Sequence, residues 1–405
     1  MPKGMTYAGT GVAYGGGLDQ FKIAAAKAAR ETEVEATRDY FGFEPLPRSR
    51  GGSVYLTRYS YPYLQQSWSI LGHLVETLGT KSLVADAMYK LTGNANYYRN
   101  LMQCAAAMVL NDAATGGVAP IVMNMLLEVG SSEWFKDTAR SQAIIEGWRD
   151  ACIKARCVWG GGETPVLKGL LYPDVFSISG SATGVSLHPD PEAFSDGSLI
   201  QDQDVIMFVM GSGIHANGLT MARNIAERKE SWLYTLKNLL FGSLQYPLQA
   251  LPNGYLIPLS DGRTYGEALL DPTPLYGPLV EDCLLAGVDL HYTVNITGHG
   301  LRKLMRPERP FAYMVDLLPK KLPIFEAIEE WGPVSEREAY ETFNEGPGFA
   351  LYVPPKEEDR VVAIADALGL KAYQAGRIYA CEEKKVCLPT YPEAIEWAAE
   401  DLQIA

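Results

Sequence analysis

The chain has 405 residues and a formal net charge of −13, with 47% hydrophobic and 20% charged residues. This length suits two or three domains, and the hydrophobic content excludes a chain that is disordered throughout. The negative charge argues against binding to nucleic acid or to an anionic membrane surface, since both attract basic proteins. No apolar run reaches the roughly 18–20 residues of a membrane helix. The Gly-rich start, residues 1–17, does not have the pattern of a signal peptide.

The six cysteines are scattered along the chain, without a CxxC pair and without a histidine at zinc-finger spacing. We therefore expect buried or incidental free thiols in a reducing cytoplasm. Together these properties predict a cytoplasmic, acidic, multidomain protein. Most proteins of that kind are enzymes that act on small molecules.

Residues 1–50 are predicted to form a Gly-rich arm and a helix over 18–33, and residues 51–195 a first domain. Apolar runs and alternation favour strands, and helical spacing of apolar residues favours helices. The predicted strands are 69–75, 118–125 and 175–185. The predicted helices are 81–91, 97–114 and 134–155.

The polar stretch 187–197 has the Pro, Asp and Gly composition of a linker, so we expect a domain boundary there. A second domain, 196–405, begins with an apolar strand at 205–210 and a helix at 219–227. Further elements are expected at 310–317, 349–353, 357–368 (a helix) and 393–402. Interleaved strands and helices indicate an α/β or α+β fold.

Polar residues recur at glycine-centred turns that follow strands or helices. The segment from Glu76 to Lys81 ends an apolar strand, where backbone N–H groups and a lysine could hold phosphates. It is not a Walker loop, and an ordinary strand-to-helix turn is the alternative. Asp112 and Glu163 could bind Mg²⁺, with a helix cap and a Gly-rich turn as the respective alternatives.

The segment 211–218, Gly-Ser-Gly-Ile-His-Ala-Asn-Gly, joins the strand at 205–210 to a helix. Its His215 and Asn217 suit anion binding or proton transfer, and the alternative is a histidine that only shapes the turn. His299 is the second histidine in a site-like setting, whereas His73 is predicted to be a core residue. Several such turns in one chain predict a single phosphate-rich site that is assembled from loops.

The amino-acid sequences of these segments and their order along the chain resemble the aminoimidazole ribonucleotide synthetase family, also called phosphoribosylformylglycinamidine cyclo-ligase. The segments that carry the resemblance are Leu78-Gly-Thr-Lys81, Asn111-Asp112, Gly161-Gly-Glu-Thr164, Gly211-Ser-Gly-Ile-His-Ala-Asn-Gly-Leu219, Asp271-Pro-Thr-Pro-Leu-Tyr276, Asn295-Ile-Thr-Gly-His-Gly-Leu301 and Thr342-Phe-Asn-Glu-Gly-Pro-Gly348. The resemblance implies two α/β domains and a homodimer in which the N-terminal domains share a β-barrel. It also implies that residues 51–195 bind ATP and form the dimer.

The resemblance also implies the cofactors ATP and Mg²⁺ and the residues that hold them. The implied nucleotide-binding residues are Gly79, Thr80, Lys81, Asn111, Gly161, Gly162, Glu163 and Thr164. The implied metal ligands are Asp112, Glu76 and Glu163. His215, Asn217 and Lys81 take the catalytic positions. The implied reaction is the ATP-dependent ring closure of formylglycinamidine ribonucleotide in purine biosynthesis, without nucleic acid or membrane partners.

The sequence departs from the family pattern at several of these segments. Ala13, Glu76, His299 and Glu345 replace the family's Asp, Asp, Gly and Met, and residues 229–250 look like an insertion. These changes leave two alternatives open. One is a sister enzyme that transfers phosphate from ATP to another acceptor, and the other is a catalytically silent scaffold protein.

Overall fold

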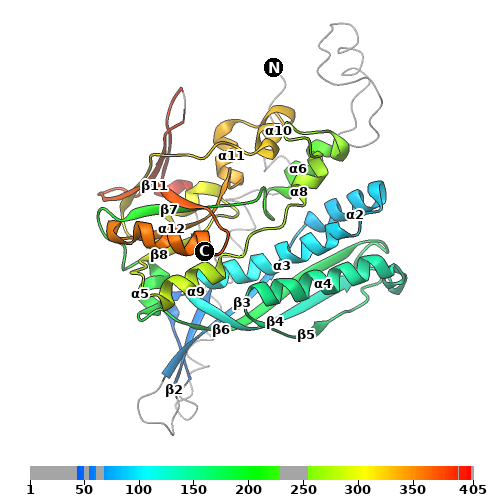
Figure 1. Ribbon diagram of the computed structural model, residues 1–405, viewed down its shortest axis with the longest axis horizontal. Helices are drawn as coiled ribbons and strands as arrows, with labels where there is room; N and C mark the ends of the chain where they lie inside the picture. The colour runs from blue at the N-terminus through cyan, green and yellow to red at the C-terminus, as the bar shows by residue number, and fades with distance from the viewer. Residues whose placement is uncertain (1–42, 50–53, 61–67, 228–253, 391, 403–405) are drawn as a thin grey trace.

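The computed structural model describes residues 43–49, 54–60, 68–227, 254–390 and 392–402. These residues form two β-sheets with helices packed on and between them (Figure 1). The predicted helix over 18–33, the position of Ala13 and the predicted insertion at 229–250 lie outside the described residues. Among the helices of the described ranges, none combines the length and apolar composition that crossing a bilayer requires.

The first sheet has six strands in the order β1-β2-β3-β6-β4-β5. Their bounds are β1 Phe43–Pro45, β2 Tyr55–Ser60, β3 Trp68–Thr77, β4 Val118–Val129, β5 Val158–Glu163 and β6 Phe176–Ser186. Neighbouring strands are antiparallel except β4 and β5, which are parallel. Buried residues alternate with partly exposed ones along β6, so the prediction of a half-exposed strand there is confirmed.

Three helices cover one face of this sheet: α2 (Lys81–Thr92), α3 (Asn96–Thr115) and α4 (Thr138–Lys154). The middle of α3 is rich in alanine and deeply buried, which allows it to pack closely between the sheet and the C-terminal elements. The helix predicted over 134–155 is interrupted. A short 3₁₀ turn, η4 (Ser132–Lys136), precedes α4, because Asp137 accepts a hydrogen bond from the Arg140 N–H and so starts a new helix.

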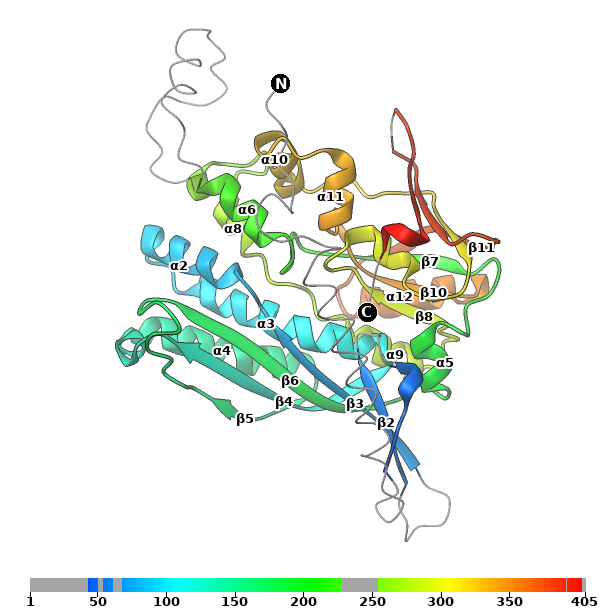
Figure 2. The same cartoon turned by 180° about the vertical axis from the view of Figure 1, so that it is seen from behind.

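No helix of the described ranges covers the other face of the first sheet, as the view from behind shows (Figure 2). Large apolar side chains are exposed on its strands: Val75 is 74% exposed, Val158 62% and Ile121 51%. His73 also lies exposed on β3, with its ring Nε2 3.2 Å from the Thr57 hydroxyl, so the prediction of a core histidine is wrong. Residues of this kind normally mark a surface that contacts another molecule.

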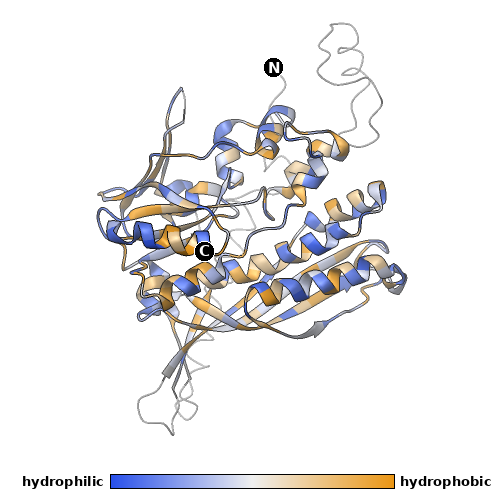
Figure 3. Cartoon of the chain, in the orientation of Figure 1, coloured by the Kyte–Doolittle hydropathy of each residue, from blue (hydrophilic) through white to orange (hydrophobic). Residues whose placement is uncertain are grey.

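The second sheet has seven strands in the order β13-β12-β9-β11-β7-β10-β8. Their bounds are β7 Val205–Met210, β8 Tyr292–Asn295, β9 Phe311–Val315, β10 Pro347–Val353, β11 Ala372–Ala380, β12 Lys385–Leu388 and β13 Ile395–Ala398. One face packs against α5 (Pro191–Asp196), α9 (Gly277–Leu285) and α12 (Glu358–Ala367). The opposite face packs against η6 (Gly300–Met305) and α11 (Glu336–Thr342). In Figure 3 the helices alternate between hydrophilic and hydrophobic colours along their length, as expected for helices that pack one side on a sheet.

Several helices beyond residue 196 share the hydrophobic core of the first sheet. They are α6 (Leu219–Ala226), α8 (Tyr265–Leu269) and α10 (Pro323–Trp331). The remaining short turns are η3 Pro47–Ser49, η5 Gly254–Leu256, η7 Pro355–Glu357 and η8 Ala399–Asp401. The two halves of the chain are therefore joined by apolar packing, and loops from both halves meet at the junction.

The stretch 187–197 is more ordered than its composition predicts. It contains α5, in which Asp190 accepts a hydrogen bond from the Ala193 N–H, Pro191 occupies the first turn and Gly197 ends the helix in the left-handed conformation. These linker-like residues are also those that begin and end short helices. The segment predicted at 393–402 contains β13 and η8.

Candidate active site between the two sheets

Lys81 is the point at which loops from both halves of the chain meet. It is the first residue of α2, its side chain is fully buried, and its Nζ donates to the carbonyl oxygens of His215 (2.6 Å) and Asp271 (3.1 Å). Its third contact is the Cys104 Sγ at 3.1 Å. Because all three N–H groups have protein partners, this geometry favours a structural role for Lys81 over direct contact with a phosphate.

The start of α2 is still available to an anion. Thr80 is its N-cap residue but its side chain makes no capping hydrogen bond, and Gly79 is exposed with a φ of 70°. The N–H groups of an uncapped first turn attract negative charge, as does the positive end of the helix dipole. This part of the predicted phosphate segment therefore has backbone N–H groups that could bind an anion.

The loop 211–218 is held in place by its neighbours. The Gly211 N–H donates to the Gly346 carbonyl at 2.7 Å, the Asn344 Nδ2 donates to the Gly213 carbonyl at 3.0 Å, and the Ser212 hydroxyl donates to the Pro272 carbonyl at 2.8 Å. Three segments that lie far apart in the sequence are thus joined into one body. The sequence prediction that such turns assemble at one place agrees with this arrangement.

His215 is enclosed within that body. It is 2% exposed, has a φ of 57°, and its Nε2 is buried without a hydrogen-bond partner among the described residues. A Cβ on Gly348 would come within 2.3 Å of the His215 Cε1, which explains the glycine. Burial, and then the charge of Lys81, lower the pKa of His215 to about 3. A neutral, enclosed imidazole suits a structural role better than proton transfer to a substrate.

Asn217 and Asn111 also face the interior. The Asn217 Nδ2 is buried and has no hydrogen-bond partner in the described part of the chain. The Asn111 Nδ2 donates to the Pro274 carbonyl at 2.9 Å, and its Oδ1 accepts from the Tyr276 N–H at 2.8 Å. Asn111 therefore fixes the segment 271–276 against α3, and its 1% exposed side chain is enclosed there.

Asp112 points to the opposite domain. Its Oδ1 accepts a hydrogen bond of 2.7 Å from the Asn295 Nδ2, at the end of β8. Asn295 is 4% exposed, whereas Asp112 is only half-buried, so one carboxylate is held in place from behind while remaining accessible. The Lys303 Nζ donates to the Asn295 carbonyl at 3.4 Å and also contacts the Thr297 hydroxyl. Asp112 and Lys303 thus both contact Asn295, Asp112 through the side-chain amide and Lys303 through the backbone carbonyl. An accessible carboxylate oxygen is a ligand that Mg²⁺ prefers.

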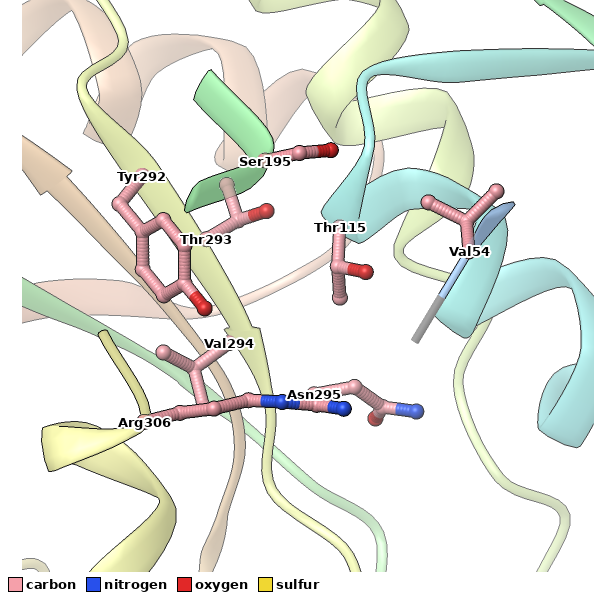
Figure 4. Close-up of a pocket in the computed structure, with 8 residues that line it drawn as sticks. All are labelled: Val54, Thr115, Ser195, Tyr292, Thr293, Val294, Asn295 and Arg306. Atoms are coloured by element: carbon pink, nitrogen blue, oxygen red, sulfur yellow. The ribbon is translucent and has the colours of Figure 1, made fainter. Parts of the chain in front are cut away.

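A narrow pocket opens beside this contact (Figure 4). It is lined by Val54, Thr115, Ser195, Tyr292, Thr293, Val294, Asn295 and Arg306. In this view the Arg306 side chain extends toward Asn295, and both residues line the pocket. The hydroxyls of Thr115 and Thr293 donate to the carbonyls of Asp112 and Ala114, which ties the end of α3 to β8.

The three predicted metal ligands do not form one cluster within a chain. Glu163 is exposed on the edge strand β5, and the β4, β6 and β3 residues in its row are Leu126, Ser179 and Thr77. Glu76 is next to Thr77 on β3, three strands away from Glu163. At about 4.8 Å per strand, the backbone positions of the two glutamates are about 14 Å apart. Oxygen ligands of one Mg²⁺ lie about 2.1 Å from the ion. No group of three metal-binding side chains is present in the described ranges.

The glycines before Glu163 have a structural reason of their own. A Cβ on Gly162 would lie 1.9 Å from the Met125 carbonyl oxygen, because β5 runs close against β4. Gly161 has a φ of 149° with open space around it, and Thr164 is exposed. Because β5 is the edge strand, Glu163 lies apart from Glu76 within one chain, and the convergence of Glu163 with Asp112 that the resemblance implies stays a prediction.

Sequence reasoning assigned no role to Asn295, which contacts Asp112, or to Lys303 and Arg306, which lie near Asn295. Asn295 lies in a segment that carried the family resemblance, but an asparagine at the end of a strand has no pattern of its own. Lys303 and Arg306 belong to a short basic stretch, residues 302–306, and this was the signal available in the sequence. The contact of Asn295 with Asp112 joins residues 183 positions apart, so it depends on packing between the two halves of the chain.

Two departures from the family pattern are accommodated by the backbone. His299 and Glu345 have φ values of 71° and 52°, and both precede a glycine that also has a positive φ. Histidine is among the non-glycine residues that adopt this conformation more readily. Glu345 is 1% exposed, so it is both conformationally and electrostatically unusual.

Known protein families match this chain in two regions, one in each half. Residues 75–186 match the N-terminal domain, and residues 283–387 the C-terminal domain, of the AIR synthase related protein family. A phosphoribosylformylglycinamidine cyclo-ligase of Lysinibacillus sphaericus is 32% identical over 276 residues, covering 67% of this chain and 71% of the relative. Its counterpart in Symbiobacterium thermophilum is 29% identical over 383 residues, 94% of this chain and 96% of the relative.

The fold has a solved counterpart. The crystal structure of a HypE–HypF complex contains a chain that matches 91% of this chain and 97% of its own length, with a TM-score of 0.50 and 12% identity. At that identity the match supports the two-domain α/β fold alone. The sequence matches show that this chain belongs to the AIR synthase family, the family of the phosphoribosylformylglycinamidine cyclo-ligases.

Proposed function

We propose that the chain catalyses the ATP-dependent ring closure of formylglycinamidine ribonucleotide to aminoimidazole ribonucleotide. The observation that carries the proposal is its similarity to cyclo-ligases over both domains, 94% of the chain in one case. In this reaction ATP phosphorylates the formyl amide oxygen, the amidine nitrogen attacks that carbon, and phosphate leaves as the imidazole ring closes. Such chemistry depends on positioning and on neutralising phosphate charge.

The residues at the junction of the two sheets fit those needs. Asp112 would hold Mg²⁺, which favours carboxylate and phosphate oxygens and keeps several waters, so one protein ligand is sufficient. Bound Mg²⁺ would neutralise phosphate charge. The uncapped start of α2 at Gly79 and Thr80 would bind phosphate oxygens, and Lys303 lies at the Asn295 contact to balance further negative charge. Lys81 and Asn111 would hold the loops of this site in place through their hydrogen bonds to residues 215 and 271–276.

The family relationship and the open sheet face support a homodimer. Exposed Val75, Ile121 and Val158 lie on strands that no helix of the described ranges covers. Pairing two such faces would bury them and would place the exposed Glu163 of one chain near the second subunit. In this proposal residues 51–195 bind ATP and form the dimer, while residues 196–405 form a separate α/β domain.

The proposed location is the cytoplasm, where purine nucleotides are made. All six cysteines are free thiols, as a reducing compartment requires. The expected partners are the ribonucleotide substrate, ATP and a second copy of the chain.

The proposal is tested with purified protein, ATP and Mg²⁺. ADP release should be slow without a second substrate and should rise when formylglycinamidine ribonucleotide is added. ADP release that responds to another acceptor, such as a different formamide or an alcohol, would identify a sister phosphoryl-transfer enzyme. ATP binding without ADP release under any of these conditions would support a scaffold protein instead.

A further inference from the structure

Two cysteines meet where α4 ends and β5 begins. The Cys157 N–H donates to the Cys152 carbonyl at 3.0 Å, and the Arg156 N–H donates to the Ile153 carbonyl at 3.1 Å. Arg156 lies between them with a φ of 60°. These two bonds around a left-handed residue form a Schellman motif, which brings the side chains of its first and last residues into contact. Here both of those residues are cysteine.

The two thiols differ in exposure. Cys152 is 3% exposed and belongs to the core beneath α4, while Cys157 is half-buried and packs against the same core. Both lie on the helix-covered side of the first sheet. The next residue, Val158, points the other way and is 62% exposed. Pairing of the open sheet faces would therefore leave Cys157 accessible.

We propose that Cys152 and Cys157 form a reversible disulfide when the protein meets a peroxide. Residues joined by a backbone hydrogen bond of this kind have Cα atoms about 5–6 Å apart, which is within the range that a disulfide spans. No cofactor is needed, and the site is separate from the proposed active site.

The chemistry is balanced by the peroxide. The Cys157 thiolate attacks one peroxide oxygen, breaking the O–O bond; this gives a sulfenic acid and, after protonation, one water. The Cys152 thiol then attacks the sulfenic sulfur, the S–S bond forms, and the hydroxyl leaves as a second water. Each hydrogen peroxide thus takes up the two electrons and two protons of the thiol pair, and a dithiol reductant reverses the change.

The roles of the two thiols follow from their hydrogen bond. The Cys152 S–H donates to Cys157, which lowers the pKa of Cys157, and both this contact and burial raise the pKa of Cys152. Cys157 is therefore the attacking thiol, because the thiolate is the reactive form and its side chain can be reached. Cys152 is the resolving thiol.

The experiment treats the folded, full-length protein with equimolar hydrogen peroxide, blocks the remaining thiols, and maps the cysteines by mass spectrometry. We expect a linkage between Cys152 and Cys157 that a dithiol reductant removes. Cys381, which is also half-buried, serves as the internal control and should stay reduced. In Cys152→Ser the sulfenic acid on Cys157 should persist and be trapped by a cyclic dione, whereas in Cys157→Ser Cys152 should stay reduced.

The proposal is overturned if Cys157 reacts no faster than Cys381, or if its oxidation yields no bond to Cys152. Circular dichroism confirms that each serine variant is folded. Cysteine and serine differ by one atom, so we expect both variants to fold like the wild type. The measurement does not use catalytic activity, so its outcome is independent of the proposed ring closure.

Discussion

His215 occupies the position that the family's glycine-loop histidine takes, yet its surroundings favour a neutral ring. Its folded-state pKa of about 3 lies below the unfolded value of 6.5. The unfolded chain therefore takes up a proton below pH 6.5 that the folded chain refuses. The stability that results is present above pH 6.5 and is lost as the pH falls toward 3, by up to about 1.4 kcal/mol per pH unit.

His215→Asn should remove this dependence. The wild type should lose unfolding free energy between pH 7 and pH 4, and the variant should not lose this contribution. The advantage of the wild type, measured in denaturant, should therefore shrink as the pH falls. Turnover per folded molecule near neutral pH should change little. A fall of about 10²-fold or more in ring closure, with stability preserved, would instead show that His215 moves a proton in the reaction.

Glu345 stands where the family has methionine, and it is buried among charged groups. The Lys321 Nζ lies 3.8 Å from its Oε2, and Lys321 also pairs with Glu329 (2.6 Å) and Glu336 (3.3 Å) and lies over the Tyr340 ring. Burial, and then the charge of Glu329, raise the pKa of Glu345 well above its usual range, against the opposing effect of Lys321.

A raised pKa means that the folded protein keeps a proton that the unfolded chain loses above about pH 4.5. Stability should therefore decrease as the pH rises from 4.5. Glu345→Gln removes this loss, and we expect it to stabilise the protein at pH 7 by on the order of 1–3 kcal/mol, with no gain at pH 4.

The control for this change is Glu326→Gln, on an exposed position of the same helix, α10, as Glu329. It should change stability little at either pH. If Glu345→Gln destabilises the protein at pH 7, the carboxylate is ionised and paired with Lys321, and this account of Glu345 is wrong.

At the scale of elements, α3 connects the two halves of the site. It carries Asn111, which holds the segment 271–276, and Asp112, which meets β8. Asp112→Asn removes the charge with little change in volume, so the fold should survive. We expect Mg²⁺-dependent ADP release to fall by on the order of 10²-fold or more. Mg²⁺ titration should also show a weaker apparent affinity. Normal turnover would leave Asp112 with a structural role only.

The sequence predicted those elements whose patterns are local. The apolar run of β7, the alternation of β6 and the helical spacing of α2 and α3 are all found where they were expected. Strand β2 was missed because its six residues, Tyr-Leu-Thr-Arg-Tyr-Ser, mix polar and apolar side chains without a long apolar run. The linker predicted at 187–197 lies between the last strand of the first sheet and the first strand of the second. The short helix α5 within it was not predicted, because Asp, Pro and Gly also start and stop short helices.

The site was harder to predict than the elements. The sequence identified the loops that meet, but it could not show that Lys81 would be enclosed by the carbonyls of His215 and Asp271. Those contacts join residues 134 and 190 positions apart. The separation of Glu163 from Glu76 likewise follows from strand order, which a single sequence does not reveal.

At the scale of the whole molecule, the uncovered sheet face predicts the assembly. We expect a homodimer at micromolar concentration by light scattering. Val75→Lys places a charge on a residue of β3 that is 74% exposed in one chain, and it should shift the protein toward monomers. Leu285→Lys, at a 69% exposed position on α9, is the matched control and should remain dimeric. An active wild-type monomer would contradict the shared barrel.

The central claim is ring closure, and its most direct measurement is the stoichiometry of products. Purified protein is incubated with ATP, Mg²⁺ and limiting formylglycinamidine ribonucleotide, and ADP, phosphate and the aminoimidazole product are quantified together. The account predicts equal amounts of all three, and no aminoimidazole without ATP. ADP formed without aminoimidazole, or a phosphorylated substrate that accumulates without closing its ring, would contradict it.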